Sequence, residues 1–295
     1  MKGTQALPLL LVGALAAGGV LYVGKRQSAG PGSATPDPME QLRAFTERET
    51  GLTFHSAPSI VPIPANELRE VIGGSLDRRF GPDGLIHRSR AYELLQLVPP
   101  GQDLRELLIA AQGAGARAWF DEQSGTIHTI AAFDPSRPDD RATLVRLLTR
   151  QLCHRTNPPP ATHPGDDAWI TRQAIHGGIA AGVQARFNQD DGGRFALPTA
   201  EETEREAILL SLPVYLHNLV QIGGLQGRDY VEARRIEGAA PWQQALNQAP
   251  ARSLDLFTTA VPSTPGPPLP ETPGTTVFQE SLGAYSSMLL SLIHN

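Results

Sequence analysis

The sequence contains little cysteine and little lysine. Cys153 is the only cysteine among 295 residues, which excludes an intrachain disulfide and a zinc site built from several cysteines. Lysine occurs only at Lys2 and Lys25, and every later cation is an arginine, a bias that we attribute to codon usage. The net charge is −5 and the arginines are scattered along the chain, so nothing indicates a nucleic-acid partner.

Long uncharged runs are also rare, and the exception lies at the start of the chain. Ala6 to Val23 is an apolar run of 18 residues, which as a helix rises about 27 Å and nearly matches a hydrocarbon core of roughly 30 Å. We therefore predict that residues 1–26 are an N-terminal transmembrane anchor, in contact with the membrane through residues 6–23. A cleaved signal peptide is the alternative, because Ala14-Leu15-Ala16 offers a small-residue cleavage site, but the apolar run continues beyond it.

The charges that flank the apolar run, Lys2 on one side and Lys25 with Arg26 on the other, do not decide the orientation of an anchor. We expect the folded part to lie outside the cytoplasm, in the periplasm or the extracellular space, and a cleaved signal would make the protein secreted. With 40% hydrophobic residues, this folded part can bury a proper core.

Turn-forming residues divide the rest of the chain. Residues 27–38 are predicted to be a flexible linker, because they hold small and polar groups with nothing to bury. Residues 39–257 carry the apolar patterns of a folded domain, 258–276 form a proline-rich loop, and 277–295 a closing helix packed on the domain. Helical patterns cover 39–50, 67–80, 87–97, 104–112, 139–155, 166–187, 201–223, 229–237, 241–248 and 278–293. Asn66, Asp103, Asp139 with Asp140, and Asp166 with Asp167 are interpreted as N-caps of four of these helices, and Gly51 as the glycine that ends the first.

The clearest β signal covers residues 116–130. Ala118 and Phe120 precede the turn at 123–125, and Ile127 and Ile130 follow it, a pattern that predicts a hairpin with a short glycine-containing turn. Residues 51–63 are apolar but interrupted by prolines, so they predict a short edge strand at best. The predicted fold class is therefore α+β, mainly helical, with a small β-hairpin or sheet.

Five segments then follow one another in a set order. They are WFDEQSGTIH at 119–128, LVRLLTRQLCHR at 144–155, AIHGG at 174–178, APARS at 249–253 and SLGA at 281–284. This order resembles a bacterial zincin-like metallopeptidase family of largely unknown substrate, whose members carry a FYDPxTGTIY-type hairpin, an HExxH helix, an A-L-x-E-G helix, a P-P-x-S-T turn and an L-G-E stretch. The resemblance covers about residues 40–290 and implies a zincin-like domain.

The departures from the family pattern fall on its catalytic positions. In that pattern two histidines and a distant glutamate bind zinc, and the glutamate of HExxH deprotonates the bound water. Here Arg150 stands for the first histidine, Gln151 for the base, His154 for the second histidine and His176 for the distant glutamate. Arginine repels a divalent ion and glutamine takes no proton, so the resemblance implies a degenerate member without hydrolytic chemistry.

Three histidines nevertheless form a candidate metal site. His154 and His176 lie on two helices that the family brings together, and His163 lies in the loop between them, so three imidazoles could hold zinc. We expect no metal, because Arg150 is one helical turn from His154. Cys153 next to His154 suggests a nucleophile and a base, but neighbouring residues on a helix point about 100° apart, which favours a buried inert cysteine.

The sequence thus predicts a membrane-anchored pseudoenzyme with a binding or structural role, with a protein or peptide as the candidate partner. One alternative is a hydrolase with a rearranged metal site around His154 and His176. Another is a structural component of an envelope assembly, which predicts an exposed apolar patch. A weaker feature is the pair Arg146 and Arg150, which share a helix face and suit an anionic ligand or an ion-paired edge.

Overall fold

The computed structural model describes residues 37–160, 165–190, 200–235, 241–257 and 283–294. Residues 37–295 form one compact unit, separate from the first 36 residues. The predicted anchor at 6–23, the linker up to residue 36, the proline-rich loop and His163 lie outside the described residues. Within the described ranges, no helix combines the length and the apolar character needed to cross a membrane.

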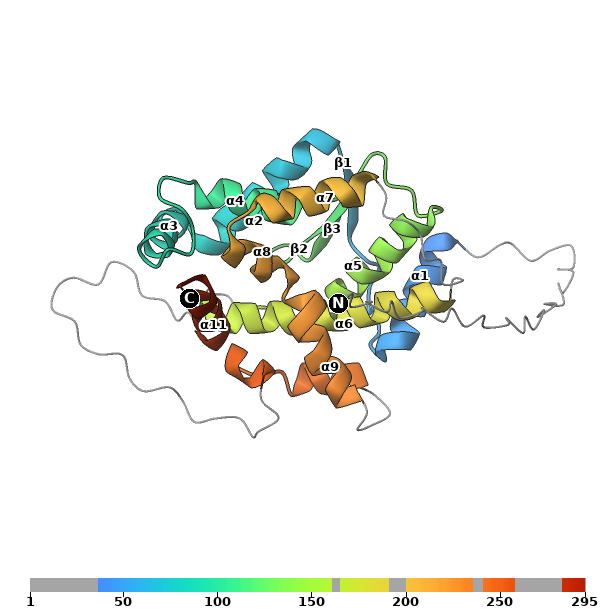
Figure 1. Ribbon diagram of the computed structural model, residues 1–295. Helices are drawn as coiled ribbons and strands as arrows, with labels where there is room; N and C mark the ends of the chain where they lie inside the picture. Colours follow the sequence, from blue (N-terminus) through green and yellow to red (C-terminus); the bar gives the residue numbers. More distant parts are fainter. Residues whose placement is uncertain (1–36, 161–164, 191–199, 236–240, 258–282, 295) are drawn as a thin grey trace, which may run out of the picture. The chain divides into compact units, whose positions relative to one another are not determined.

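The unit is mainly helical with one small sheet (Figure 1). The strands are β1 (Ile60–Ile63), β2 (Ala118–Asp121) and β3 (Thr126–Ile130). The helices are α1 (Pro38–Thr50), the 3₁₀ turn η1 (Ala65–Glu67), α2 (Leu68–Phe80), α3 (Gly84–Leu94), α4 (Leu104–Gly113), α5 (Pro138–Thr156), α6 (Asp166–Asp190), α7 (Ala200–Ser211), α8 (Val214–Gln221), the π-helix η2 (Gly223–Gly227), α9 (Arg228–Arg235), α10 (Pro241–Asn247), the 3₁₀ turn η3 (Ser253–Leu256) and α11 (Gly283–His294).

The predicted hairpin and the predicted edge strand are both confirmed. β2 pairs antiparallel with β3, with Phe120 opposite Ile127, and β1 pairs parallel with β3 at the edge of the sheet. Both Phe120 and Ile127 are buried, as their alternation predicts. The turn closes at Gly125, whose φ of 68° favours glycine.

The turn of the hairpin is fixed to α2 by one buried carboxylate. Asp121 accepts hydrogen bonds from Ser75 at 2.5 Å and from Arg78 at 2.8 Å, both on α2. It also accepts from the backbone N–H of Gln123 at 3.0 Å. The residue after Asp121 is Glu122, so this anchoring sets the position of the Glu122 side chain.

The two longest helices, α5 and α6, pack along one another at the centre of the unit. Their buried faces contain the residues that the apolar pattern predicts, including Leu144, Leu148, Leu152, Ile170 and Ile179. In Figure 1, α2 and α4 are drawn to the left of β2 and β3, and α9 lies below α6. Burial of this apolar surface is the main stabilising contribution to the arrangement.

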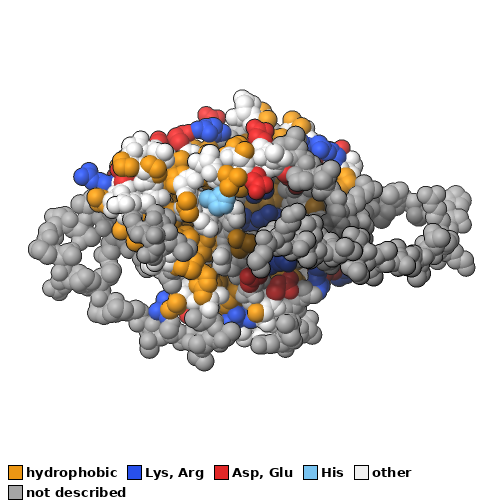
Figure 2. Space-filling model, in the orientation of Figure 1, with side chains coloured by type: hydrophobic (Ala, Val, Ile, Leu, Met, Phe, Trp, Pro, Cys, Tyr) orange, Lys and Arg blue, Asp and Glu red, His pale blue; other side chains and the backbone are white. Residues whose placement is uncertain are grey.

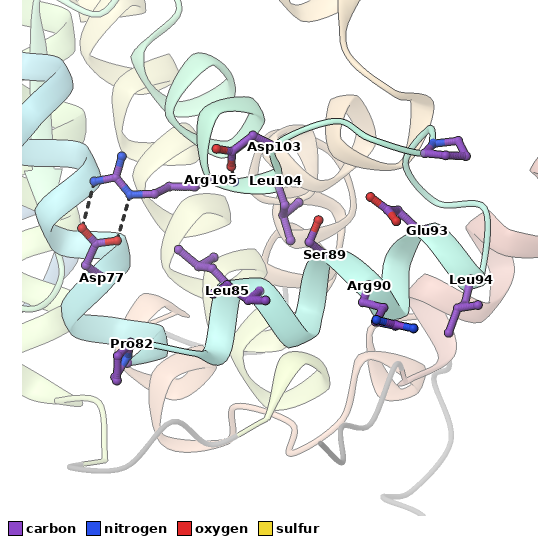
Figure 3. Close-up of a pocket in the computed structure, with 13 residues that line it drawn as sticks. Asp77, Pro82, Leu85, Ser89, Arg90, Glu93, Leu94, Asp103, Leu104 and Arg105 are labelled. Atoms are coloured by element: carbon purple, nitrogen blue, oxygen red, sulfur yellow. Dashed lines mark hydrogen bonds and ion pairs between the residues drawn. The ribbon is translucent and has the colours of Figure 1, made fainter. Parts of the chain in front are cut away.

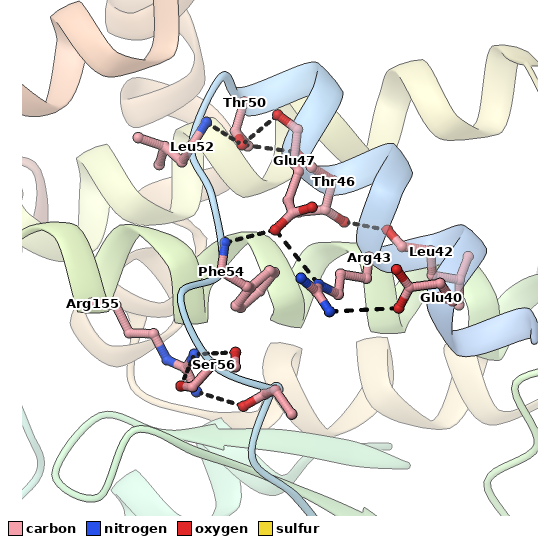
Figure 4. Close-up of polar contacts among 11 residues, drawn as sticks. Glu40, Leu42, Arg43, Thr46, Glu47, Thr50, Leu52, Phe54, Ser56 and Arg155 are labelled. Atoms are coloured by element: carbon pink, nitrogen blue, oxygen red, sulfur yellow. Dashed lines mark hydrogen bonds and ion pairs between the residues drawn. The ribbon is translucent and has the colours of Figure 1, made fainter.

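The segment between α1 and β1 is held by polar contacts from both sides (Figure 4). Glu47 on α1 accepts a hydrogen bond of 2.7 Å from the backbone N–H of Phe54. Arg155 at the end of α5 donates to the carbonyl oxygens of Ser56 at 2.9 Å and Ala57 at 3.1 Å. These contacts guide the chain from α1 into β1, which then completes the sheet beside the hairpin.

Several predicted helix starts and ends differ from the structure. Asn66 lies inside η1, and α2 begins at Leu68 without a side-chain cap, so that N-cap prediction is wrong. The predicted helix over 201–223 is divided into α7 and α8 at Pro213, because proline lacks an N–H group and disfavours a helical conformation of the residue before it.

The aspartates interpreted as N-caps have a different role in the structure. Asp140 is buried and accepts from the Arg117 guanidinium at 2.8 Å, while α5 begins earlier, at Pro138. Asp166 accepts from Arg88 at 2.8 Å, and Asp167 accepts from Ser253. The N-cap interpretation is wrong for these three aspartates and for Asp139, because α5 follows the N-cap Arg137 and α6 already begins at Asp166. Sequence proximity to a helix start does not reveal a partner from a distant segment.

Candidate functional site

The positions that match the zinc motif lie where α5 passes the hairpin turn and α6. Gln151 is fully buried, and its side-chain amide donates to the carbonyl oxygen of Gly125 at 2.7 Å and to that of Ser59 at 3.2 Å. It therefore ties the hairpin turn and the residue before β1 to α5. An amide that donates to two backbone carbonyl groups has a structural role and cannot act as a general base.

Arg150, which the resemblance aligns with the first zinc ligand, is held by an ion pair. Its guanidinium donates to Glu122 at 2.9 Å and to the side-chain oxygen of Gln173 at 2.5 Å. Gln173 in turn donates to the other carboxylate oxygen of Glu122 at 2.5 Å. Burial alone would raise the pKa of Glu122, but the charges of Arg150 and Arg79 outweigh it and lower the pKa to about 2. Glu122 is therefore ionised at neutral pH.

His154 is half-buried at the end of the motif. Its ring contacts Phe120 edge to face, with centroids 5.5 Å apart. Burial and the nearby charge of Arg172 lower its pKa, so the ring is neutral at pH 7. Its Nδ1 has no hydrogen-bond partner among the described residues.

His176 on α6 is 1% exposed. Burial, with Arg172 as the next contribution, holds its pKa well below the ordinary value of 6.5, and its Nε2 has no hydrogen-bond partner in the described part of the chain. His154 also contributes to this lowered pKa, so the two rings lie within electrostatic range of one another. The third predicted imidazole, that of His163, belongs to residues outside the described ranges.

The donor set at this place does not fit a zinc ion. The Arg172 guanidinium acts on both imidazoles, the Arg150 guanidinium acts on His176, and the Gln151 amide donates to backbone carbonyls. Among the described residues, no group of three or more His, Cys, Asp or Glu side chains has an arrangement suited to a metal. A divalent cation would thus face fixed positive charge where the family has a ligand.

The side chains of Cys153 and Ser253 are both buried and have structural roles. Cys153 is fully buried, and burial raises the pKa of its thiol to about 12, so it is protonated and inert at neutral pH. Ser253 is buried, donates to Asp167, and accepts from the backbone N–H of Tyr285 at 2.9 Å. Its hydroxyl links α6, η3 and α11.

Glycines bring η2 close to α6 beside the candidate site. A Cβ atom on Gly177 would lie 2.8 Å from the Cα of Gly223, and one on Gly178 would collide with the backbone of Gly227. Two elements can approach this closely only without side chains between them. This contact gives a physical reason for the glycine pair in the AIHGG segment, and it places Gly177 and Gly223 in the wall of a cavity.

The cavity has a volume of about 170 Å³ and lies between α2, α4, α5, α6 and α8. Its polar wall is formed by Arg79, Arg146, Arg150, Arg205, Glu122, Gln173 and Trp169. Arg79 stacks on the Trp169 ring, with its guanidinium carbon 3.7 Å from the ring centroid. The pair Arg146 and Arg150 was a candidate from helical spacing, but no sequence pattern joins them to Arg79, Glu122 or Trp169, because these come from three other elements.

A second hollow lies on the surface beside α3 (Figure 3). Charged side chains of Asp77, Arg105, Glu93 and Arg90 line it together with Leu85 and Leu94. Arg105 and Asp77 are ion-paired at 2.8 Å on its rim, and both are partly exposed. This groove holds no buried titratable group and is more open than the cavity at Arg150, so that cavity is the better candidate site.

No family model, no curated protein and no solved structure matches this chain.

Proposed function

We propose that this protein is a membrane-anchored binding domain on a zincin-like scaffold that has lost its peptidase chemistry. The observation that carries the proposal is the Arg150–Glu122–Gln173 network, at the position where the resemblance predicts the first zinc ligand. The buried contacts of Gln151 support it, since the position of the catalytic base has become a structural tie. The apolar run at 6–23 supports the anchor and a folded unit outside the cytoplasm.

Hydrolysis and zinc content test the loss of chemistry directly. The full chain is purified in a mild non-ionic detergent, and cleavage of an unstructured protein substrate is measured with and without added zinc. We expect no cleavage above background and negligible zinc by elemental analysis. Zinc-dependent cleavage that disappears in His154→Ala would instead establish a hydrolase with a rearranged metal site around His154 and His176.

Restoring the motif tests the zincin-like scaffold itself. The combined change Arg150→His, Gln151→Glu and His176→Glu supplies the family's ligands and base, so equimolar zinc is expected in the purified variant. A control with Arg150→Gln, Gln151→Asn and His176→Gln changes the same positions without zinc ligands, and no zinc is expected there. If both variants fold and bind equally little zinc, the zincin-like alignment is wrong.

A structural role in an envelope assembly is the second candidate function, and one observation favours it. Leu94 and Val214 are 79% and 59% exposed and line the same shallow hollow at the end of α3. Replacing both with serine should reduce the apparent mass of the detergent-solubilised particle in size-exclusion chromatography. An unchanged particle in the double variant argues against this candidate.

A further inference from the structure

The cavity beside Arg150 has an unusual charge balance. Of the residues that line it, four are arginines, Arg79, Arg146, Arg150 and Arg205, and one is a carboxylate, Glu122. Figure 2 shows arginine side chains, in blue, recessed near the centre of the drawn face. The whole chain carries a net charge of −5, so this concentration of cations in one cavity runs against its overall charge.

The carboxylate does not balance the cations. Both oxygens of Glu122 are engaged, one by Arg150 and the other by Gln173. Within the described part of the chain, no carboxylate is ion-paired to Arg79 or Arg146. Burial, then the charges of Arg150 and Arg205, lower the pKa of Arg146 to about 10. Burial also lowers the pKa of Arg79 to about 9, although Glu122 and Asp166 act in the opposite direction.

The buried groups of the cavity wall that lack a hydrogen-bond partner are donors. Nε of Arg150 and Nε1 of Trp169 are buried and have no hydrogen-bond partner among the described residues. Both side chains line the cavity, and neither group can act as an acceptor. A buried donor without a partner costs free energy, and like charges in a partly desolvated site add to this cost. A ligand with several acceptor oxygens and negative charge relieves both.

We propose that this cavity binds a small oxyanion, a carboxylate or phosphate compound. The inference rests on the proposed binding function and names the chemical class of its ligand. A volume of about 170 Å³ is close to the roughly 150 Å³ that accommodates benzene, so the ligand is compact. Leu108, Leu219 and Ile222 complete the wall and suit a short carbon chain beside the charged groups. A guanidinium group can donate two parallel hydrogen bonds to a carboxylate or a phosphate, and all four cations of the cavity are arginines.

Calorimetric titration tests the inference. The full chain in mild detergent is titrated separately with sodium pyrophosphate and with sodium succinate, at low and constant ionic strength. We expect saturable binding of at least one of them, with one molecule per chain, and the preferred probe distinguishes a phosphate ligand from a carboxylate ligand. No saturable binding of either anion overturns the inference, and it leaves the tests of zinc and hydrolysis unaffected.

Two variants decide where the anion binds. Arg146→Met removes a charge but keeps an unbranched apolar stem, and affinity should fall at least tenfold, because hydrogen bonds to charged groups are strong. Arg90→Gln is the matched control, since Arg90 lines the separate groove beside α3, and its affinity should equal that of the unchanged protein. Equal losses in both variants would show nonspecific attraction and overturn the inference.

A stability measurement separates a ligand-binding role of Arg146 from a structural one. Without an added anion, thermal unfolding of Arg146→Met should occur at or above the temperature of the unchanged protein, because the substitution removes repulsion from Arg150 and Arg205. With pyrophosphate or succinate, whichever binds, the unchanged protein should gain more stability than the variant. A variant that unfolds at a lower temperature without anion and binds the anion normally would overturn the inference.

Discussion

Two groups of arginines in the folded unit differ in how their charge is balanced. Arg88 on α3 and Arg117 before β2 each face a buried carboxylate, Asp166 and Asp140, at 2.8 Å. Around the cavity, by contrast, four arginines line the wall with a single carboxylate, that of Glu122, which is ion-paired to Arg150. A buried cation with its own carboxylate maintains the fold, because removing one partner leaves an uncompensated charge. Cations in excess of their carboxylates indicate a place for a negatively charged ligand.

The largest effect is expected from breaking the balanced group. Asp166 is 2% exposed and accepts from Arg88 and from the Tyr92 hydroxyl at 2.8 Å. Asp166→Ala should lower the free energy of unfolding by about 3–5 kcal/mol, because the Arg88 charge stays buried. Chemical denaturation measures this loss.

Asp190, at the opposite end of α6, supplies the control for the Asp166→Ala prediction. Asp190 faces Arg48 at 3.8 Å, and both side chains are more than half exposed. Asp190→Ala should therefore change the free energy of unfolding by less than about 0.5 kcal/mol. Similar losses from both substitutions would contradict the distinction between a buried and an exposed ion pair.

A medium effect is expected at the carboxylate of the unbalanced group. Glu122→Gln removes the charge opposite Arg150 and Arg79 and should lower the free energy of unfolding by about 1–3 kcal/mol. The same variant should bind the oxyanion more tightly, because the cavity becomes more positive. Adding Arg146→Met to Glu122→Gln should stabilise the protein by more than Arg146→Met does alone, because Glu122 no longer offsets the cations. An additive double variant would show that the two charges do not act on one another.

The smallest effect concerns the dependence of stability on pH. The folded-state pKa of His176 lies below its ordinary value of 6.5, so the unfolded chain binds more protons below that pH. Its contribution to stability is present above about pH 6.5 and is lost as the pH falls toward the folded-state pKa, with a slope of at most about 1.4 kcal/mol per pH unit. His176→Gln should flatten this decline between pH 6.5 and pH 5, as measured by thermal unfolding.

Glu122 adds a separate loss of stability in stronger acid. Its pKa is about 2 in the folded state and 4.5 ordinarily, so its ion pair stabilises the protein above about pH 4.5 and is lost toward pH 2. The Glu122→Gln variant should lack this second decline, while the decline due to His176 remains. If both variants follow the pH curve of the unchanged protein, other groups are responsible for its acid sensitivity.

Local patterns predicted much of the fold. The spacing of apolar residues predicted α5 and α6, alternation and Gly125 predicted the hairpin, and Gly51 predicted the end of α1. Asp103 caps α4 through the backbone N–H of Arg105 at 2.8 Å, as its position predicted. Predictions failed where a distant partner decided the outcome, as with Asp140, whose partner Arg117 lies on the other side of the hairpin.

The sequence by itself determined most of the helices and the hairpin, because these depend on neighbours within a few positions. It also put Arg150 and Gln151 at the positions where the predicted zinc motif would have a histidine and a base. Tertiary structure decided which side chains surround Arg150. Arg79, Glu122, Arg146, Trp169 and Arg205 lie on five segments, and only the packing of these segments brings them to one cavity. Electrostatic balance depends on distance and burial, so an excess of arginines becomes visible only when the chain is folded.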